Sequence, residues 1–272
     1  MKKIKDIIWK AKILLGKTCS VPNFIIIGAQ RCGTTSLFES LMESPYILKP
    51  VRKEIHFFDI NYKKGYKWYL NQFPHIRDEN YLTGEATPYY FYHPAVPLRV
   101  YDFCKIMNKE IKFILLLRNP IDRAISHYKF NRIRGIETLS FEDAIKAEPQ
   151  RIGGEDSKLI NNHHYYSFNH QKFSYLSRGI YVEQLKRWLN FFPLEKFLVI
   201  SSEDFFKEPQ TIINLICKFL NCEPYELRNI KKFNKSHINL SVSSQMRREL
   251  SKYFLPYNKQ LFELIGKEFD WD

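Results

Sequence analysis

The sequence lacks any arrangement of cysteines that would cross-link a fold or hold zinc. No two of them stand in a C-x-x-C pair, and their number is odd: Cys19, Cys32, Cys104, Cys217 and Cys222. Disulfide frameworks of small secreted proteins typically use even sets of cysteines, whereas free cysteines are typical of reducing compartments. The cysteine pattern therefore favours a protein of a reducing compartment.

Long apolar runs are also absent. No stretch approaches the roughly 18 consecutive apolar residues of a transmembrane helix. The N-terminus, MKKIKDIIWKAKILLGK, is basic, has apolar residues at helical spacing, and lacks the cleavage site of a signal peptide. Two interpretations stay open for residues 1–20: an interfacial helix on an anionic membrane, or a first helix packed on the domain.

The overall composition is that of an ordinary globular protein. Of 272 residues, 44% are hydrophobic and 16% aromatic, and the formal net charge is +13. Such a charge favours anionic partners: nucleotides, nucleic acid, acidic glycans or a membrane surface. We find no internal repeat or low-complexity run, so we expect a basic amphipathic segment over residues 1–20 and a single domain over residues 21–272.

Short apolar runs alternate with helical patterns along the chain. We predict buried strands at residues 23–28, 46–48, 81–84, 111–117 and 196–201. We predict helices at residues 34–43, 97–108, 121–134, 140–147, 181–191 and 209–220. This alternation predicts an α/β fold, a single P-loop-like domain with a central parallel sheet of about five strands flanked by α-helices. Ligands of such sheets bind beyond the carboxyl ends of the strands.

Residues 148–177 interrupt the alternation. They are rich in His, Asn, Tyr and Gly and show weak periodicity, which predicts an irregular functional loop or lid. The adjacent His163 and His164 point apart, and no cysteine or carboxylate completes a metal-ligand set. We therefore expect a solvated loop and no metal site.

The stretch FIIIGAQRCGTTSLFESL has the layout of a phosphate-binding strand, loop and helix. Gly28 and Gly33 have the Walker A spacing and Thr35 fills its Ser/Thr place, but the lysine position holds Thr34. Backbone N–H groups of residues 29–34 can converge on an anion at the start of the helix. The loop therefore predicts an anion site that lacks the usual lysine.

Arginines stand where a kinase would need other groups. Arg31 supplies a cation within the loop, and the strand in IKFILLLRNPIDRAISHY ends in Arg118 instead of an acidic Mg²⁺ ligand. Ser126 follows two turns into the next helix and can face the same crevice. A guanidinium and a hydroxyl together suit a phosphomonoester, although a structural ion pair and an ordinary helical serine would look the same.

A second polar cluster lies in VRKEIHFFD. If this stretch is extended, Glu54 and His56 fall on one side and Ile55 and Phe57 on the other. Either Glu54 or His56 is then placed to act as a general base. The alternative is a surface charge cluster anchored by core phenylalanines.

The segments GAQRCGTTSL and LLLRNPIDRAISHY resemble the two motifs with which sulfotransferases bind 3′-phosphoadenosine 5′-phosphosulfate (PAPS). In that family the first motif holds the 5′-phosphosulfate and the second holds the 3′-phosphate. Residues 22–271 are similar to heparan sulfate 3-O- and N-sulfotransferases of bacterial type, in the same order, through KEIHFFD, GYKWYLNQFP, EATPYYF, VPLRVYD, YVEQLKRWLNFFP and YFLPYNKQLFELIGKEFDW. Several motifs in one order are more specific than a lone pattern.

The resemblance implies a PAPS-dependent sulfotransferase (EC 2.8.2 type). It would transfer a sulfuryl group to a hydroxyl or amine of a glycan or glycolipid by metal-free in-line displacement and release 3′,5′-ADP. It implies catalytic roles for Glu54 as general base, His56 and Arg31. The implied donor-binding residues are Gln30, Arg31, Cys32, Gly33, Thr34, Thr35, Arg118 and Ser126, and the implied acceptor-binding residues are Arg52, Asp59 and Glu85.

The chain departs from the family pattern in three places. The family usually has Lys in place of Arg31, and 3-O-sulfotransferases have an acceptor-side Lys where this chain has Ala86. The C-terminal nucleotide loop is shortened to FNKSHINLS, without the cysteines of a disulfide hairpin, and leaves Lys235, Ser236 and His237 as expected PAPS contacts. The missing hairpin and anchor predict a cytoplasmic enzyme, with peripheral membrane contact through residues 1–20 left open.

Two other functions remain as alternatives. A P-loop nucleotide kinase would need a Walker lysine and an acidic Mg²⁺ ligand. A non-enzymatic binder of acidic polysaccharide or nucleic acid would use the net charge, but no recognised nucleic-acid motif is present, so we expect no specific nucleic-acid partner.

Overall fold

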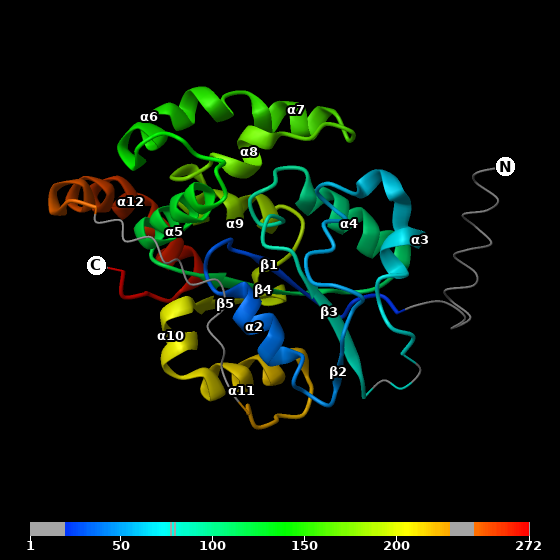
Figure 1. The fold of residues 1–272 in the computed structure, drawn as a ribbon. Helices are drawn as coiled ribbons and strands as arrows, with labels where there is room; N and C mark the ends of the chain where they lie inside the picture. The colour runs from blue at the N-terminus through cyan, green and yellow to red at the C-terminus, as the bar shows by residue number, and fades with distance from the viewer. Residues whose placement is uncertain (1–19, 77, 79, 229–241, 272) are drawn as a thin grey trace.

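A parallel sheet forms the centre of the protein (Figure 1). The computed structural model describes residues 20–76, 78, 80–228 and 242–271. In this part of the chain the sheet consists of β1 (Phe24–Gly28), β2 (Ile47–Leu48), β3 (Leu82–Ala86), β4 (Lys112–Leu117) and β5 (Phe197–Ser201). Neighbouring strands are parallel, in the order β2-β3-β1-β4-β5. The predicted α/β fold is confirmed, with strand ends shifted by one or two residues.

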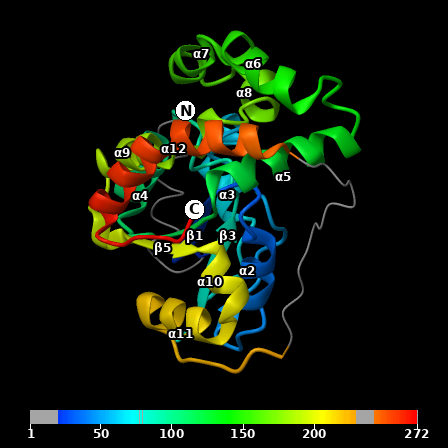
Figure 2. The same cartoon turned by 90° about the vertical axis from the view of Figure 1, so that its left-hand side faces the viewer.

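Helices cover both faces of the sheet (Figures 1 and 2). One face carries α2 (Thr34–Leu41), α10 (Ser202–Lys207) and α11 (Pro209–Leu220). The other carries α4 (Val96–Met107), α5 (Pro120–Ile133), α9 (Tyr181–Leu189) and α12 (Ser244–Ile265), while α3 (Gly65–Leu70) packs beside α4. Because both faces are covered, β1, β3 and most of β4 are fully buried.

An outer layer lies above α5 (Figure 1). It contains α6 (Phe141–Ile152), α7 (Glu155–Asn161) and α8 (Phe168–Lys172), so the prediction of an irregular loop over residues 148–177 is wrong. Buried polar contacts hold this layer: the Glu148 carboxylate accepts hydrogen bonds from the Leu176 and Ser177 backbone N–H groups at 2.6 and 2.8 Å. Such contacts leave no apolar periodicity for sequence reasoning to detect.

The helix α12 was not predicted either. It runs for 22 residues with Pro256 in its interior and has three buried side chains, Leu250, Phe254 and Leu261. A proline and a narrow apolar stripe weaken the helical signal. Contacts with α9 and α5 place the helix on the same side as the outer layer.

The order of the strands creates the site. After β1 the chain passes to β2 and β3 on one side of the sheet, and after β4 it passes to β5 on the other side. The connections that follow β1 and β4 therefore diverge at the carboxyl ends of these two neighbouring strands. This topological switch point is where doubly wound sheets bind ligands. The predicted phosphate-binding loop and Arg118 both emerge there.

Candidate active site

A pocket of about 760 Å³ opens at the carboxyl ends of β1 and β4. Several separate segments of the chain meet in it. The predicted residues that line it are Gln30, Arg31, Cys32, Gly33, Thr34, Thr35, Glu54, Arg118 and Ser126. The structure therefore brings both predicted anion-binding motifs and the predicted base into one cavity.

The loop after β1 turns into α2 at Gly33, whose φ of 92° is left-handed. A Cβ at this position would lie 2.9 Å from the Phe206 ring, so both backbone and space favour glycine. The Cys32 side chain is buried, and burial raises the pKa of its thiol to about 11. Cys32 is thus protonated at neutral pH, and its backbone N–H donates to the Ala29 carbonyl oxygen at 3.3 Å.

Arg31 projects from the loop towards α5. Its Nε donates a hydrogen bond to Ser126 Oγ at 3.1 Å, and its Cζ lies 4.6 Å from the centre of the Phe130 ring. Burial and the neighbouring Arg118 lower the pKa of Arg31 to about 10, which still leaves the side chain charged at neutral pH. The first loop and Ser126 of the second motif are therefore in direct contact.

Arg118 follows β4 directly and stands at the entry to α5. Its Nη2 lies 3.9 Å from Asp122 Oδ2, and Asp122 also pairs at 2.9 Å with Arg247 from α12. The Asn119 side chain caps α5 by accepting from the Ile121 N–H at 2.9 Å. This cap fixes the start of the helix that carries Ser126, so Arg118 and Ser126 face the pocket together.

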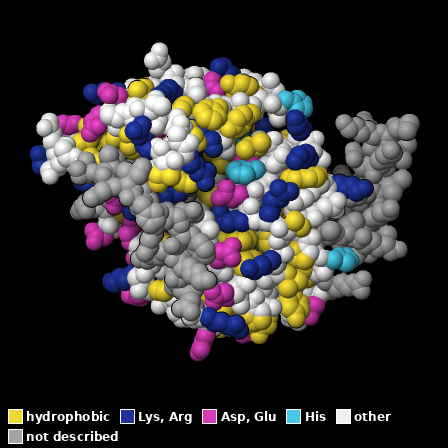
Figure 3. Space-filling model, viewed as in Figure 1, with side chains coloured by type: hydrophobic (Ala, Val, Ile, Leu, Met, Phe, Trp, Pro, Cys, Tyr) yellow, Lys and Arg dark blue, Asp and Glu magenta, His cyan; other side chains and the backbone are white. Residues whose placement is uncertain are grey.

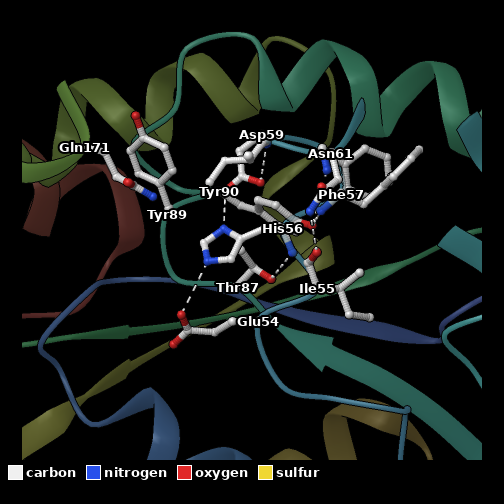
Figure 4. Close-up of polar contacts among 12 residues, drawn as sticks. Glu54, Ile55, His56, Phe57, Asp59, Asn61, Thr87, Tyr89, Tyr90 and Gln171 are labelled. Atoms are coloured by element: carbon white, nitrogen blue, oxygen red, sulfur yellow. Dashed lines mark hydrogen bonds and ion pairs between the residues drawn. The ribbon is translucent and has the colours of Figure 1, made fainter. Parts of the chain in front are cut away.

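Glu54, His56 and Asp59 form a chain of contacts on the other side of the pocket (Figure 4). His56 Nδ1 lies 2.6 Å from Asp59 Oδ2, and His56 Nε2 lies 3.4 Å from Glu54 Oε2. Lys53 Nζ donates to the other Glu54 oxygen at 2.7 Å. Glu54 therefore lies between two cationic groups, with a second carboxylate behind the imidazole.

This arrangement moves two pKa values in opposite directions. Burial by itself would raise the pKa of Glu54, but hydrogen bonding from His56 and the charge of Lys53 outweigh it and lower the pKa to about 2. Burial by itself would lower the pKa of His56, but the charge and hydrogen bond of Asp59, together with Glu54, raise it to about 10. At neutral pH Glu54 is therefore a carboxylate and His56 an imidazolium.

The segment that carries these groups is not the extended strand that we considered. Glu54 and His56 adopt left-handed backbone conformations, with φ of 59° and 53°. The segment is held from below because Tyr90 Oη accepts from the Phe57 and Phe58 backbone N–H groups at 2.7 and 3.3 Å. These contacts with the core fix the backbone so that the side chains of Glu54 and His56 lie against each other.

Two of the three predicted acceptor contacts need correction because they are buried, whereas the role of the third, Arg52, stays a prediction. Glu85 is 0% exposed, and its carboxylate accepts from the Tyr69, Thr87 and Tyr90 hydroxyls at 2.7, 2.7 and 3.2 Å. The Asp59 side chain is 0% exposed and supports His56. Arg52 is exposed beside the Trp68 ring, at 6.0 Å from its centre, and is not among the pocket-lining residues. The carboxylates of Glu85 and Asp59 are engaged by other residues of the protein, and the sequence gives no sign of these contacts.

Some predictions fall on residues that the structure does not describe. The expected nucleotide contacts Lys235, Ser236 and His237 lie outside the described residues, as does the N-terminal segment apart from Ser20. Within the described ranges, no cluster of three His, Cys, Asp or Glu suits a metal ion, and no helix is long and apolar enough to cross a membrane.

Sequence reasoning missed several residues of the pocket. Figure 3 shows acidic and histidine side chains at the centre of this face, surrounded by Lys and Arg. The pocket-lining residues that were not predicted include Asp122, Lys129, Phe130, Arg134, Glu203 and Arg247. Lys129 and Phe130 follow Ser126 on α5 by three and four residues, and Arg134 directly follows the end of that helix. This helical spacing was a usable signal.

The outer layer also reaches the pocket. The fully buried Arg178 donates from Nη1 to the side-chain oxygen of Gln30, and its Nη2 donates to the carbonyl oxygens of His170 and Gln171, each at 3.0 Å. One guanidinium thus joins the loop after β1 to the end of α8. The region that looked like a free loop is part of the framework of the site.

Comparison with known proteins agrees with this geometry. Residues 21–254 match the family model described as "Sulfotransferase domain". The human heparan sulfate glucosamine 3-O-sulfotransferase 5 is 30% identical over 92% of this chain and 74% of its own length. A membrane-associated sulfotransferase of Dictyostelium discoideum is 28% identical over 94% of this chain and 68% of its own length. A sulfotransferase structure from Alicyclobacillus acidocaldarius superposes with a TM-score of 0.72 and 29% identity, covering 92% of this chain and 98% of that one.

Proposed function

This chain belongs to the sulfotransferase-domain family, and from that premise we propose that its pocket binds PAPS across the ends of β1 and β4 and sulfates a glycan or glycolipid. The chain is a PAPS-dependent sulfotransferase, as its family and relatives imply. The observation that carries the finer proposal is the convergence of the loop after β1, Arg118, Ser126 and Glu54 in one pocket.

The donor would lie along the two anion-binding motifs. The backbone N–H groups at the start of α2, from Gly33 to Thr35, suit the 5′-phosphosulfate, because a helix N-terminus favours negative charge. The N–H groups of Ala29 and Cys32 instead donate to the carbonyl oxygens of Leu116 and Ala29, at 2.7 and 3.3 Å. Arg118 and Ser126 suit the 3′-phosphate. Arg31, in contact with Ser126, lies between the two groups and carries a charge that either can use.

The transfer would be an in-line displacement at sulfur. The acceptor oxygen or nitrogen forms a bond to sulfur as the bond from sulfur to the 5′-phosphate oxygen breaks. The acceptor proton passes to Glu54, and the negative charge on departing 3′,5′-ADP is stabilised by Arg31 and the loop amides. Since the pKa of Glu54 is held near 2, this carboxylate is always ionised but weakly basic. Proton transfer is therefore expected late, when the bond to sulfur has made the acceptor group acidic.

The acceptor class rests on similarity together with charge. The relatives named above include an enzyme that sulfates the glucosamine of heparan sulfate, and cationic side chains border Glu54 in this pocket. Ala86, where the similar enzymes carry an acceptor-side lysine, is 0% exposed in β3. We propose a glycan hydroxyl or amine whose contacts differ from those of heparan sulfate enzymes, and a cytoplasmic location stays a prediction.

Calorimetric titration with 3′,5′-ADP in EDTA tests the donor site. We expect micromolar binding of 3′,5′-ADP and much weaker, still measurable binding of 5′-AMP, because the latter lacks the 3′-phosphate. Binding of ATP that requires Mg²⁺, with no response to 3′,5′-ADP, would instead favour a kinase and contradict the proposal.

A further inference from the structure

The Phe130 ring contacts two guanidinium groups in the pocket. Arg31 Cζ is 4.6 Å and Arg134 Cζ is 3.9 Å from the centre of the ring. Phe130 follows Ser126 by one helical turn on α5, so ring and hydroxyl lie on one face of the helix. Arg31 contacts both, since its Nε donates to Ser126 Oγ at 3.1 Å.

Arg31 needs such support because its surroundings repel it. Burial and the like charges of Arg118, Arg134 and Arg123 act against its charged form. The face of an aromatic ring attracts a cation without neutralising it.

We propose that Phe130 is a positioning residue that holds Arg31 in the orientation from which it meets the sulfuryl donor. The inference rests on the proposed function of the pocket. It also explains why arginine suits this loop: a planar guanidinium stacks on a ring, whereas the ammonium of lysine is compact and strongly hydrated. Phe130 and Arg31 should therefore act as a pair.

The test combines a measurement without ligand and one with nucleotide. The Nε–H resonance of Arg31, assigned by its loss in Arg31→Lys, is recorded in wild type, Phe130→Leu and Phe130→Tyr. Calorimetry with 3′,5′-ADP is run on the same proteins and on Arg31→Lys/Phe130→Leu. Phe168→Leu, which removes an exposed ring from α8, is the matched control for loss of a phenylalanine.

Phe130→Leu should shift the Arg31 resonance and weaken 3′,5′-ADP about 5- to 10-fold, as expected for losing a partly buried cation–π contact. Phe130→Tyr should keep the wild-type resonance and the wild-type affinity for 3′,5′-ADP. The loss of affinity caused by Phe130→Leu should be smaller in the Arg31→Lys background than in wild type. An unchanged resonance in Phe130→Leu, or equal losses of affinity in the two backgrounds, would overturn the proposal. If wild type fails to bind 3′,5′-ADP, the donor assignment fails, while the resonance still decides whether Phe130 orients Arg31.

Discussion

On the donor side of the pocket, the functional groups emerge directly from the ends of β1 and β4, and the backbone of Gly33 and the cap at Asn119 fix the two helices that follow. On the Glu54 side no strand or helix carries the groups. The segment is irregular, left-handed at Glu54 and His56, and tied to the core through Tyr90.

The difference lies in what holds each side in place. A strand end and a helix start are placed by the sheet, so loss of one side chain there should change binding with little effect on the backbone. The Glu54 segment depends on a buried network that includes Glu85, Tyr69 and Tyr90. Changes there should affect catalysis and stability together unless they keep the shape of the network.

The largest effect is expected from Glu54→Gln. Removing the base should lower transfer to an acceptor found with PAPS by about 10²- to 10⁴-fold, while the affinity for 3′,5′-ADP stays within about twofold because the donor contacts lie elsewhere. Rates are measured with radiolabelled PAPS and affinities by calorimetry. Turnover near the wild-type rate would remove Glu54 from the role of base.

Glu85→Gln tests the buried network of hydrogen bonds that supports the Glu54 segment. Burial, partly offset by the Thr87 and Tyr69 hydroxyls, raises the pKa of Glu85 to about 7 from 4.5. Because the folded-state pKa is the higher one, wild type loses stability as pH rises from about 4.5 to 7. The loss is about 3 kcal/mol, at 1.36 kcal/mol for each unit of pKa.

Glutamine mimics the protonated acid, so Glu85→Gln should lack this loss. When Tm is measured from pH 5 to pH 8, the Tm of the variant relative to that of wild type should increase as pH rises. Parallel Tm curves for the two proteins would mean that Glu85 stays ionised within its ring of hydroxyls.

Arg118→Ala addresses the donor side. It removes a charge-assisted contact worth about 1.5–3 kcal/mol, so 3′,5′-ADP should bind about 10- to 100-fold more weakly while Tm changes little. The affinity for 5′-AMP, which has no 3′-phosphate, should hardly change. An equal loss for both nucleotides in calorimetry would place Arg118 away from the 3′-phosphate.

The smallest effect is expected from His56→Asn. Without the hydrogen bond from His56, the pKa of Glu54 should rise from about 2 towards its ordinary value of 4.5. An acid limb should then appear between about pH 4 and 5 in kcat/KM, where wild type shows none. Lys53→Gln is the matched control and should move the limb less. Identical pH profiles for His56→Asn and wild type would show that His56 does not control Glu54.

Prediction from sequence succeeded where the signal was local and failed where distant contacts decided the outcome. Gly28, Gly33, Arg118 and Ser126 belong to short patterns next to apolar runs, and the sheet follows from those runs. Residues 148–177 and α12 were missed because buried polar contacts and a proline obscure the apolar period. Glu85 was predicted to bind the acceptor because the sequence gives no sign of the three hydroxyls around its carboxylate.

The sequence by itself determined the parallel α/β fold, the family, and the positions of the two motifs predicted to bind anions, because each depends on residues that are neighbours in the chain. The tertiary structure alone decided that Glu85 and Asp59 are buried supports, that Arg31 rests on Phe130 and Ser126, and that Arg178 joins the outer layer to the loop after β1. Burial and partner charges set the role of an ionisable group, and both come from residues far away in the sequence.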